Sequence, residues 1–510
     1  MTAWTGGYVT DLTYTHGFYR ELTPALLAFG ALAKGEHAPA VDAPLAYCEL
    51  GCGQGFSTNL LAAANPHISF HATDFNPAQI AGAQRLAAEA GTPNVQFYDH
   101  AFADFAREPS LPAAFDIIAL HGIYSWISTE NRAHIAAFIR DRLKPGGLVY
   151  ISYNALPGWA AAMPLRRLLV DQAGTRNGPI APRIEEALAF AERLRATKPL
   201  YLTQNPAVET RLEGIKGMSR NYLAHEYFNR DWTPFHFADV AAELAAAKLD
   251  FLGSANLLDH VNAINLTDEQ AALLAEVADP VRREGLRDYM VNQQFRRDIF
   301  AKGRLPHSVA SAREVWLGTR FILSTPRADV RLKVTGSRGD ATLQADTYEP
   351  ILDALAKGPA TLRQLIADPA IDGLGWGRLM QAFALLVGMG VVQSALPAKD
   401  DAKRAQRTRA FNNAICERAK TSADLAYLAS PVTGGGVGVD RIAQLFLLAR
   451  GRKEADAAQF AWTILAAQGQ SLLKDGKPLA TPEENLAELR GRLVAFTAGQ
   501  LPVLQQMGIA

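Results

Sequence analysis

The sequence predicts an α/β fold built on a doubly wound, Rossmann-like parallel sheet, followed by a mainly helical C-terminal region. Two observations predict it: a glycine-rich turn directly after an apolar strand, and alternating short apolar strands and helical segments over residues 45–153. Such alternation is typical of βαβ units, because parallel strands need a crossover between them. Ligands bind these sheets at the carboxyl ends of the strands, so the residues that come directly after each strand are the candidates for a site.

The expected elements follow one another in a regular order. Residues 1–40 combine several aromatic side chains with an apolar helical pattern from Pro24, and we expect an N-terminal helical cap over the site. A turn is expected at Lys144–Gly147, where one proline and two glycines follow each other. The remaining expected elements are Leu45–Glu49, a helix, Ile68–Asp74, a helix over 77–90, Val95–Tyr98, Phe115–Leu120, a helix over 129–142 and Leu148–Tyr153.

The strand pattern stops after Tyr153 and resumes near Leu249. We therefore expect a helical insertion at about 160–232 that caps the site, inside a sheet domain that spans 41–303. Strands at Leu249–Gly253 and within 294–301 would complete the sheet.

Beyond Gly303 the composition changes. Three parts are expected there: a linker with a hairpin (strands at Val315–Leu323 and Val330–Val334) at 304–345, a winged-helix-like domain at 346–395 and a helical region at 396–510. Winged helices often read nucleic-acid grooves, but Arg378 is the only cation on the third helix of this unit, so packing or partner binding is expected instead.

The composition limits the classes of function. The 510 residues contain 51 Lys+Arg and 51 Asp+Glu, so the net charge is about zero and a nucleic-acid partner is not expected. The first residues lack the pattern of a signal peptide, and no apolar run reaches the roughly 20 residues of a membrane span. A cytoplasmic protein without a membrane span is expected.

The cysteines predict neither a disulfide framework nor a metal site. There are three, Cys48, Cys52 and Cys416, and the first two lie within the strand and turn with no further ligand nearby in the sequence. Buried or partly buried thiols are the expected outcome.

The glycine turn has the form Glu49-x-Gly51-x-Gly53-x-Gly55. A dinucleotide loop needs G-x-G-x-x-G/A, but Phe56 occupies the position that must be small. An acid before the first glycine suits a cationic or hydroxyl-rich ligand better than a pyrophosphate. S-adenosylmethionine fits this description, because it carries a cationic methionine end and a neutral ribose. Its expected contacts in the turn are Glu49, Gly51, Cys52, Gly53 and Gly55.

A second acid strengthens this interpretation. Asp74 ends the next expected strand and is followed by Phe75, and both are expected to contact the cofactor. At that place a carboxylate can accept hydrogen bonds from both ribose hydroxyls. The turn, Asp74 and the βαβ pattern together favour S-adenosylmethionine over NAD or a purely structural domain.

Further runs of residues carry a resemblance to a known family. They are His121–Trp126 (HGIYSW), Tyr153–Trp159 (YNALPGW), Asn221–Tyr227, Arg287–Arg296 and Ala429–Gly434. With the glycine turn and Asp74 they resemble the class I methyltransferases that carry a methyltransferase regulatory domain, some of which are bacterial protein-lysine methyltransferases. The resemblance covers nearly the full chain and implies a methyltransferase sheet with an inserted or appended helical domain; it names no substrate.

The adenine contact departs from the family's pattern. Class I members commonly place an acid after the third strand, where this chain has Ala101. Asp99 is one alternative, and backbone groups with stacking by Phe102 are another. At the N-terminus, Tyr14 and His16 either close the cofactor pocket or fix the first helix.

Methyl transfer from a sulfonium is an in-line displacement that mainly requires alignment and exclusion of water. His121, Tyr124 and Trp126 come after the fourth strand, where a histidine or tyrosine could orient a lysine amine or take its proton. The alternatives are a loop histidine bonded to backbone for His121 and simple packing for Trp126.

Three more residues are candidates. Asn154 follows the fifth strand and could point its amide at a substrate amine or at the cofactor carboxylate. His225 and Tyr227 lie in the expected cap and either reach the site or serve the cap's structure. Position 229 is asparagine rather than a second histidine, which excludes a zinc motif, and no metal is expected.

The function favoured at this point is an S-adenosylmethionine-dependent methyltransferase that N-methylates lysine side chains of a protein acceptor. A small-molecule or natural-product methyltransferase is one alternative, since the same fold serves both. A non-catalytic scaffold that senses the cofactor is another.

Overall fold

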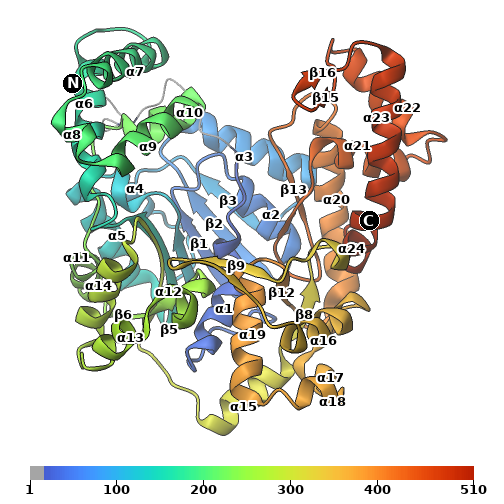
Figure 1. The fold of residues 1–510 in the computed structure, drawn as a ribbon. Helices are drawn as coiled ribbons and strands as arrows, with labels where there is room; N and C mark the ends of the chain where they lie inside the picture. The colour runs from blue at the N-terminus through green and yellow to red at the C-terminus, as the bar shows by residue number, and fades with distance from the viewer. Residues whose placement is uncertain (1–7, 9–15) are drawn as a thin grey trace.

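A seven-stranded sheet lies at the centre of the molecule, and the computed structural model describes Tyr8 and residues 16–510 (Figure 1). The strand order is β3-β2-β1-β4-β5-β7-β6. Strands β1 to β5 pair in parallel, and β7 runs antiparallel between β5 and β6. The strands are β1 (Leu45–Leu50), β2 (Ile68–Thr73), β3 (Val95–Tyr98), β4 (Phe115–Leu120), β5 (Leu143–Asn154), β6 (Leu249–Ser254) and β7 (Phe295–Lys302). The predicted doubly wound fold is confirmed.

Each face of the sheet is covered by helices. Alternate side chains of β1 enter different cores, because successive residues of a strand point to opposite faces. Tyr47 packs with the core beneath α2 and α3, whereas Cys48 and Leu50 pack with α5 and α11. Apart from those of the insertion after β5, the helices between the strands of this domain are α2 (Phe56–Ala64), α3 (Pro77–Ala90), α4 (Phe102–Phe105), α5 (Thr129–Arg142), α11 (Phe237–Ala245), α12 (Asn262–Asn265), α13 (Asp268–Ala275) and α14 (Pro280–Val291).

Strand β5 is longer than predicted. The expected turn at Lys144–Gly147 is a bulge inside the strand, because pairing with β4 exists on both sides of it, at Leu143 and again from Leu148. Lys144 leaves the ladder and its Nζ lies 2.7 Å from a carboxylate oxygen of Asp116. The proline and glycines therefore interrupt the ladder without ending the strand.

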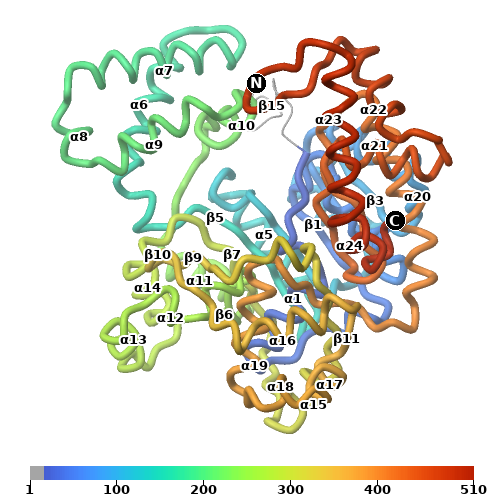
Figure 2. Tube along the Cα trace, turned by 45° about the vertical axis from the view of Figure 1, so that its right-hand side comes forward, coloured from blue at the N-terminus to red at the C-terminus, as the bar shows by residue number. Residues whose placement is uncertain are grey.

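Five helices come after β5 and share a core of their own. Trp159, Leu169, Ile184 and Leu212 belong to this core. In both views the five helices stand on the opposite side of the molecule from the C-terminal helices (Figures 1 and 2). They are α6 (Met163–Gly174), α7 (Ile180–Ala196), α8 (Leu200–Thr203), α9 (Pro206–Lys216) and α10 (Arg220–Tyr227). We call α6–α10 the cap.

The first long helix does not cover the site as expected. Helix α1 (Pro24–Ala33) packs against β6 and the C-terminal part of the chain, and Phe29 contacts Trp316 and Phe321 edge-on. An apolar helix is stabilised where it buries most surface, and both of these partners offer it apolar side chains. The residues just before α1 approach the site instead.

Residues 304–395, which follow β7, contain two separate small sheets. The predicted strand Val315–Leu323 is a helix, α15 (Val309–Gly318), followed by a short strand β8 (Arg320–Leu323). Strand β8 pairs with β11 (Ala360–Thr361) and β12 (Val392–Ala395), while β9 (Lys333–Gly336) pairs with β10 (Gly339–Thr342). The expected hairpin between the first two strands was wrong, because β8 is buried and already has partners on both edges.

The winged-helix-like order is present around β8. Four helices precede β12: α16 (Ala345–Ala356), α17 (Leu362–Leu365), α18 (Pro369–Asp372) and α19 (Trp376–Gly388). Phe321 of β8 stacks on Phe383 of α19 at 4.2 Å between ring centroids, so strand and helices share one core.

The last hundred residues join the core of the sheet. Phe411 packs on Phe56 of α2, and Asn65 Nδ2 donates a 2.7 Å hydrogen bond to the carbonyl of Gly434. Removing this region would therefore expose the core beneath α2. Its elements are α20 (Asp401–Arg418), β13 (Tyr427–Ala429), β14 (Gly436–Gly438), α21 (Arg441–Gly451), α22 (Ala457–Ala466), β15 (Leu473–Lys474), β16 (Lys477–Pro478), α23 (Pro482–Ala495) and α24 (Leu501–Gln506).

The part of the chain that the structure describes has neither a helix that could span a membrane nor a metal-binding cluster of side chains. No helix there combines the length and the apolar character that crossing a bilayer requires. No group of three or more His, Cys, Asp or Glu side chains in that part is arranged to hold a metal ion.

Candidate active site

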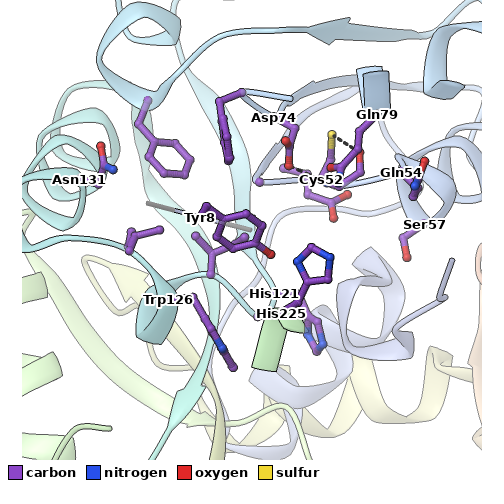
Figure 3. Close-up of a pocket in the computed structure, with 18 of the residues that line it drawn as sticks. Tyr8, Cys52, Gln54, Ser57, Asp74, Gln79, His121, Trp126, Asn131 and His225 are labelled. Carbon is purple, nitrogen blue, oxygen red and sulfur yellow. Dashed lines mark hydrogen bonds between the residues drawn. The ribbon is translucent and has the colours of Figure 1, made fainter. Parts of the chain in front are cut away.

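A pocket opens at the carboxyl ends of β1, β2 and β4, where the strand order reverses (Figure 3). The cavity has a volume of about 180 Å³, which is far more than one bound water needs. The glycine turn, the ends of β2 and β4, the cap and the segment before α1 all contribute side chains to it. Its lining includes Tyr8, Gly17, Tyr19, Glu49, Gly51, Cys52, Gly53, Gln54, Ser57, Asp74, Phe75, Gln79, His100, Ala101, Phe102, His121, Ile123, Trp126, Asn131, His225, Glu226 and Asp231.

Two glycines of the turn serve different purposes. Both have positive φ, +53° at Gly53 and +64° at Gly55, which side-chain-bearing residues rarely adopt. A Cβ on Gly55 would lie 2.5 Å from the Cβ of Ala83, so this glycine lets α2 approach α3. Among the described residues, a Cβ on Gly53 would meet only Gln79, at 3.7 Å, and both residues line the pocket. Gly53 thus leaves backbone open to a ligand, whereas Gly55 lies outside the pocket.

Two buried carboxylates flank the turn. Asp74 Oδ2 accepts a 3.0 Å hydrogen bond from the Gly53 N–H, and Oδ1 accepts one from the Asn76 N–H. Glu49 accepts a hydrogen bond from the hydroxyl of Thr58 at 2.5 Å. Both acids are less than a tenth exposed.

Burial changes the acidity of both groups. It raises the pKa of Glu49 to about 7; the charge of Asp74 raises it too, and the Thr58 hydrogen bond acts in the opposite direction. Burial also raises the pKa of Asp74 to about 6, against the lowering effect of the Asn76 and Gly53 N–H groups. Negative charge concentrated in this way favours a ligand that brings a positive charge and hydroxyl donors.

The expected contact between Asp99 and adenine has no support in the geometry of the pocket. That side chain is exposed, lies outside the pocket and is 3.7 Å from the ring of His100. The chain turns after β3 so that Ala101 and Phe102, together with Phe75, face the pocket. Apolar surface and backbone groups therefore form this wall.

His121 lies at the end of β4, stacked on Tyr19 with 3.7 Å between ring centroids. Its Nδ1 is 2.8 Å from the Tyr150 hydroxyl and 3.4 Å from that of Ser152. Burial lowers the pKa of His121 to about 3, and the charge of Arg297 lowers it further. The imidazole is therefore neutral near pH 7 and a weak base.

Of the two aromatic residues after His121, one lines the pocket. Trp126 faces it and donates from Nε1 to the backbone carbonyl of Glu226 at 3.4 Å. Tyr124 is fully buried in the core of the sheet and donates to the carboxylate of Glu243. The predicted catalytic role of Tyr124 has no support in this position, because its hydroxyl is already engaged away from the pocket.

The cap places His225 in the pocket but not Tyr227. Tyr227 packs edge-on against Trp159, and its hydroxyl accepts a 3.3 Å hydrogen bond from Arg211. Each helical residue turns the direction by about 100°, so His225 and Tyr227, two positions apart, point to nearly opposite sides of α10. Tyr227 therefore stabilises the cap.

Asn154 lies behind the site rather than in it. It is 4% exposed and does not line the pocket; its backbone N–H donates to Ser125 Oγ at 2.9 Å. Its Nδ2 has no hydrogen-bond partner among the residues that the structure describes.

Several residues that line the pocket were not predicted from the sequence. Tyr8 lies between the rings of Phe75 and His225, at 5.8 and 5.4 Å (Figure 3). The sequence feature that could have indicated Tyr8 was the aromatic-rich start of the chain. Glu226 was indicated only by its place beside His225. The predicted Tyr14 lies outside the described residues, and His16 does not line this pocket.

Two family models match the chain. Residues 48–149 match a methyltransferase domain, and residues 219–302 match a predicted methyltransferase regulatory domain. The first match contains the end of β1, the glycine turn and β2 to β4, and the second contains α10 with His225 and Glu226. Both therefore contribute to the pocket.

The chain has relatives that match over its full length and over part of it. An uncharacterized protein of Synechocystis sp. is 44% identical over 507 residues, which cover 99% of this chain and 100% of that protein. An uncharacterized protein of Rickettsia prowazekii is 26% identical over 298 residues, and this chain spans only 52% of its length.

Among solved structures, PKMT2 from Rickettsia typhi in complex with AdoHcy has the same fold, with a TM-score of 0.69 and 19% identity. The match covers 97% of this chain and 99% of that one. Together with the two family models and the glycine turn, these findings show that the chain belongs to the class I S-adenosylmethionine-dependent methyltransferases that carry a methyltransferase regulatory domain.

Proposed function

We propose that the enzyme transfers the methyl group to the side-chain amine of lysine in a protein acceptor. The observation that carries this proposal is the pocket itself, which runs from the glycine turn to the cap and is lined with carboxylates and aromatic rings. The full-length likeness to PKMT2, a protein lysine methyltransferase of Rickettsia, supports the choice of acceptor.

The pocket fits S-adenosylmethionine. The open backbone at Gly53 admits the methionine part, Asp74 is placed to accept hydrogen bonds from the ribose hydroxyls, and Phe75 offers an apolar face to the adenine. The charge of Glu49 complements the positive end of the cofactor. The bound cofactor supplies an activated methyl group on sulfur.

The acceptor side of the pocket then has to align an amine and exclude water. We assign this task to His121, Trp126 and His225, which line the pocket opposite the glycine turn. With a pKa of about 3, His121 is a weak base, so its role is to orient the acceptor by hydrogen bonding. Asn154 is left out, because it does not face the pocket.

The test is labelling of acceptors by the purified enzyme. A bacterial lysate incubated with the enzyme and with cofactor carrying an isotopically labelled methyl group should yield labelled methyl-lysine on hydrolysis of its proteins. The reaction with excess S-adenosylhomocysteine serves as the control. Label confined to metabolites would instead establish the small-molecule alternative, and label on protein carboxyl or hydroxyl groups would reject a lysine acceptor.

The affinity for S-adenosylmethionine should depend on pH. We expect it to be constant above about pH 8 and to fall as the pH is lowered toward about 5, because Glu49 and Asp74 lose their charge below pKa values of about 7 and 6. Titration calorimetry across this range measures the effect. A double variant, Glu49→Gln with Asp74→Asn, should bind weakly with no such slope; an affinity of the parent enzyme that rises on acidification would contradict this assignment.

A further inference from the structure

The charged side chains that line the active-site pocket are of one sign. Among the described lining residues there are four carboxylates, Glu49, Asp74, Glu226 and Asp231, and neither a lysine nor an arginine. Glu49 and Asp74 lie at the ends of β1 and β2 and face the cofactor. Glu226 and Asp231 come from α10 and the turn after it, and the cofactor accounts for neither.

Contacts at the backbone hold Glu226 at the pocket. Its carbonyl accepts the hydrogen bond from Trp126 Nε1, which ties the end of α10 to the residues after β4. Burial raises the pKa of Tyr222 to about 12, and the negative charge of Glu226 raises it too. Burial also raises the pKa of Tyr8 and Tyr227, and the charge of Glu226 adds to the effect in both.

Aromatic rings surround the same part of the pocket. Tyr19 is stacked on His121, and the ring centroids of Tyr8 and His225 are 5.4 Å apart. Trp126 lies near them (Figure 3). Faces of aromatic rings attract ammonium groups, and the attraction grows when the group is removed from water. A carboxylate beside such rings suits a cationic nitrogen on an alkyl chain.

We propose that Glu226, assisted by Asp231, binds the positively charged nitrogen of the acceptor and thereby determines specificity for amines. This rests on the proposed function. Glu226 is the main group, because it follows His225 on α10 and its backbone carbonyl is bonded to Trp126, and both of these residues belong to the acceptor side. Asp231 Oδ2 lies 2.9 Å from Nη2 of the exposed Arg230.

The charge balance of the reaction fits this placement. The bound ammonium first loses a proton to water; the amine then forms a bond to the methyl carbon while the carbon–sulfur bond breaks, and that electron pair stays on sulfur. The positive charge moves from sulfur to the nitrogen beside Glu226. A fixed carboxylate at that point stabilises the charge as it develops.

Glu226→Gln tests the proposal, with Glu209→Gln on the exposed side of α9 as the matched control. The probes are N-acetyl-lysine methylamide and its uncharged analogue N-acetyl-norleucine methylamide, titrated by NMR into enzyme saturated with S-adenosylhomocysteine. We expect the parent and Glu209→Gln to prefer the lysine probe, and Glu226→Gln to bind it about ten-fold or more weakly. Glu226→Asp, which keeps the charge, should restore part of the affinity. S-adenosylhomocysteine should bind all variants equally, which also shows that they are folded.

Two results would overturn the proposal: unchanged binding of the lysine probe by Glu226→Gln, or equal binding of both probes by the parent enzyme. The proposed function fails separately, when labelled lysate yields no methyl-lysine. Methyl-lysine formation combined with unchanged probe binding would reject only the role of Glu226.

Discussion

Replacing Asp74 with alanine should weaken the binding of S-adenosylmethionine by about 100-fold or more. Two hydrogen bonds from ribose hydroxyls to an ionised carboxylate contribute roughly 1.5–3 kcal/mol each, and water replaces only part of this. Because each 1.4 kcal/mol is about a factor of ten, two lost bonds account for the effect. The variant also loses the two bonds that Asp74 accepts from the N–H groups of Gly53 and Asn76, which hold the glycine turn. Calorimetry with the purified variant measures the change.

Two controls separate charge from shape. Asp74→Asn keeps the size and one acceptor oxygen, so we expect a smaller loss, about ten-fold. Asp104→Ala removes a carboxylate that pairs with Arg107 at the surface of α4, and it should leave cofactor affinity unchanged. An Asp74→Ala variant that binds the cofactor as well as the parent would show that another group holds the ribose.

The sheet could be predicted from the sequence because its signals are local. The apolar run at Leu45–Leu50, the glycine turn and the proline at the start of α3 each act within a few residues of where they stand. The bulge at Lys144–Gly147 was missed, because the same residues form a turn when no neighbouring strand continues the ladder. Local chemistry predicts the interruption, and only the pairing with β4 decides whether the strand continues beyond it.

The position of distant segments could not be predicted in this way. Nothing near Phe411 indicates that its ring will meet Phe56, more than three hundred residues earlier in the chain. The same holds for α1, whose apolar surface would suit any apolar partner, and for β8, whose partners β11 and β12 come later. Such contacts depend on the shape of the whole core.

The residues of the site show the same difference between local signals and contacts that depend on the whole fold. Glu49, Gly53 and Asp74 were found because each stands at a fixed offset from a strand end. Tyr124 and Tyr227 were misplaced, since the choice between core and pocket depends on the direction of one side chain on a short helix. Glu226 was missed because its proposed role depends on the charges of the other residues that line the pocket. Those residues lie far apart in the sequence.

Replacing Gly55 with alanine should lower the free energy of unfolding by about 2–5 kcal/mol. The backbone there has a φ of +64°, which costs a residue with a side chain roughly 1–2 kcal/mol. The new methyl group would lie 2.5 Å from the Cβ of Ala83 and 2.8 Å from the ring of Phe97, and such overpacking costs typically 1–3 kcal/mol. Both neighbours are buried, so relief requires a shift of α3 or β3. Denaturant unfolding of the cofactor-free protein measures the loss.

Gly53→Ala is the matched comparison. Its φ is also positive, at +53°, but among the described residues the added methyl would meet only Gln79, at 3.7 Å, so the loss of stability should stay near about 1–2 kcal/mol. The methyl would instead occupy space in the pocket, and the affinity for S-adenosylmethionine should fall more than the stability does. The two variants thus separate the role of Gly55, which lets α2 pack on α3, from that of Gly53, which leaves backbone open to the cofactor. If Gly55→Ala were as stable as the parent, or if Gly53→Ala bound the cofactor normally, this division between the two glycines would be wrong.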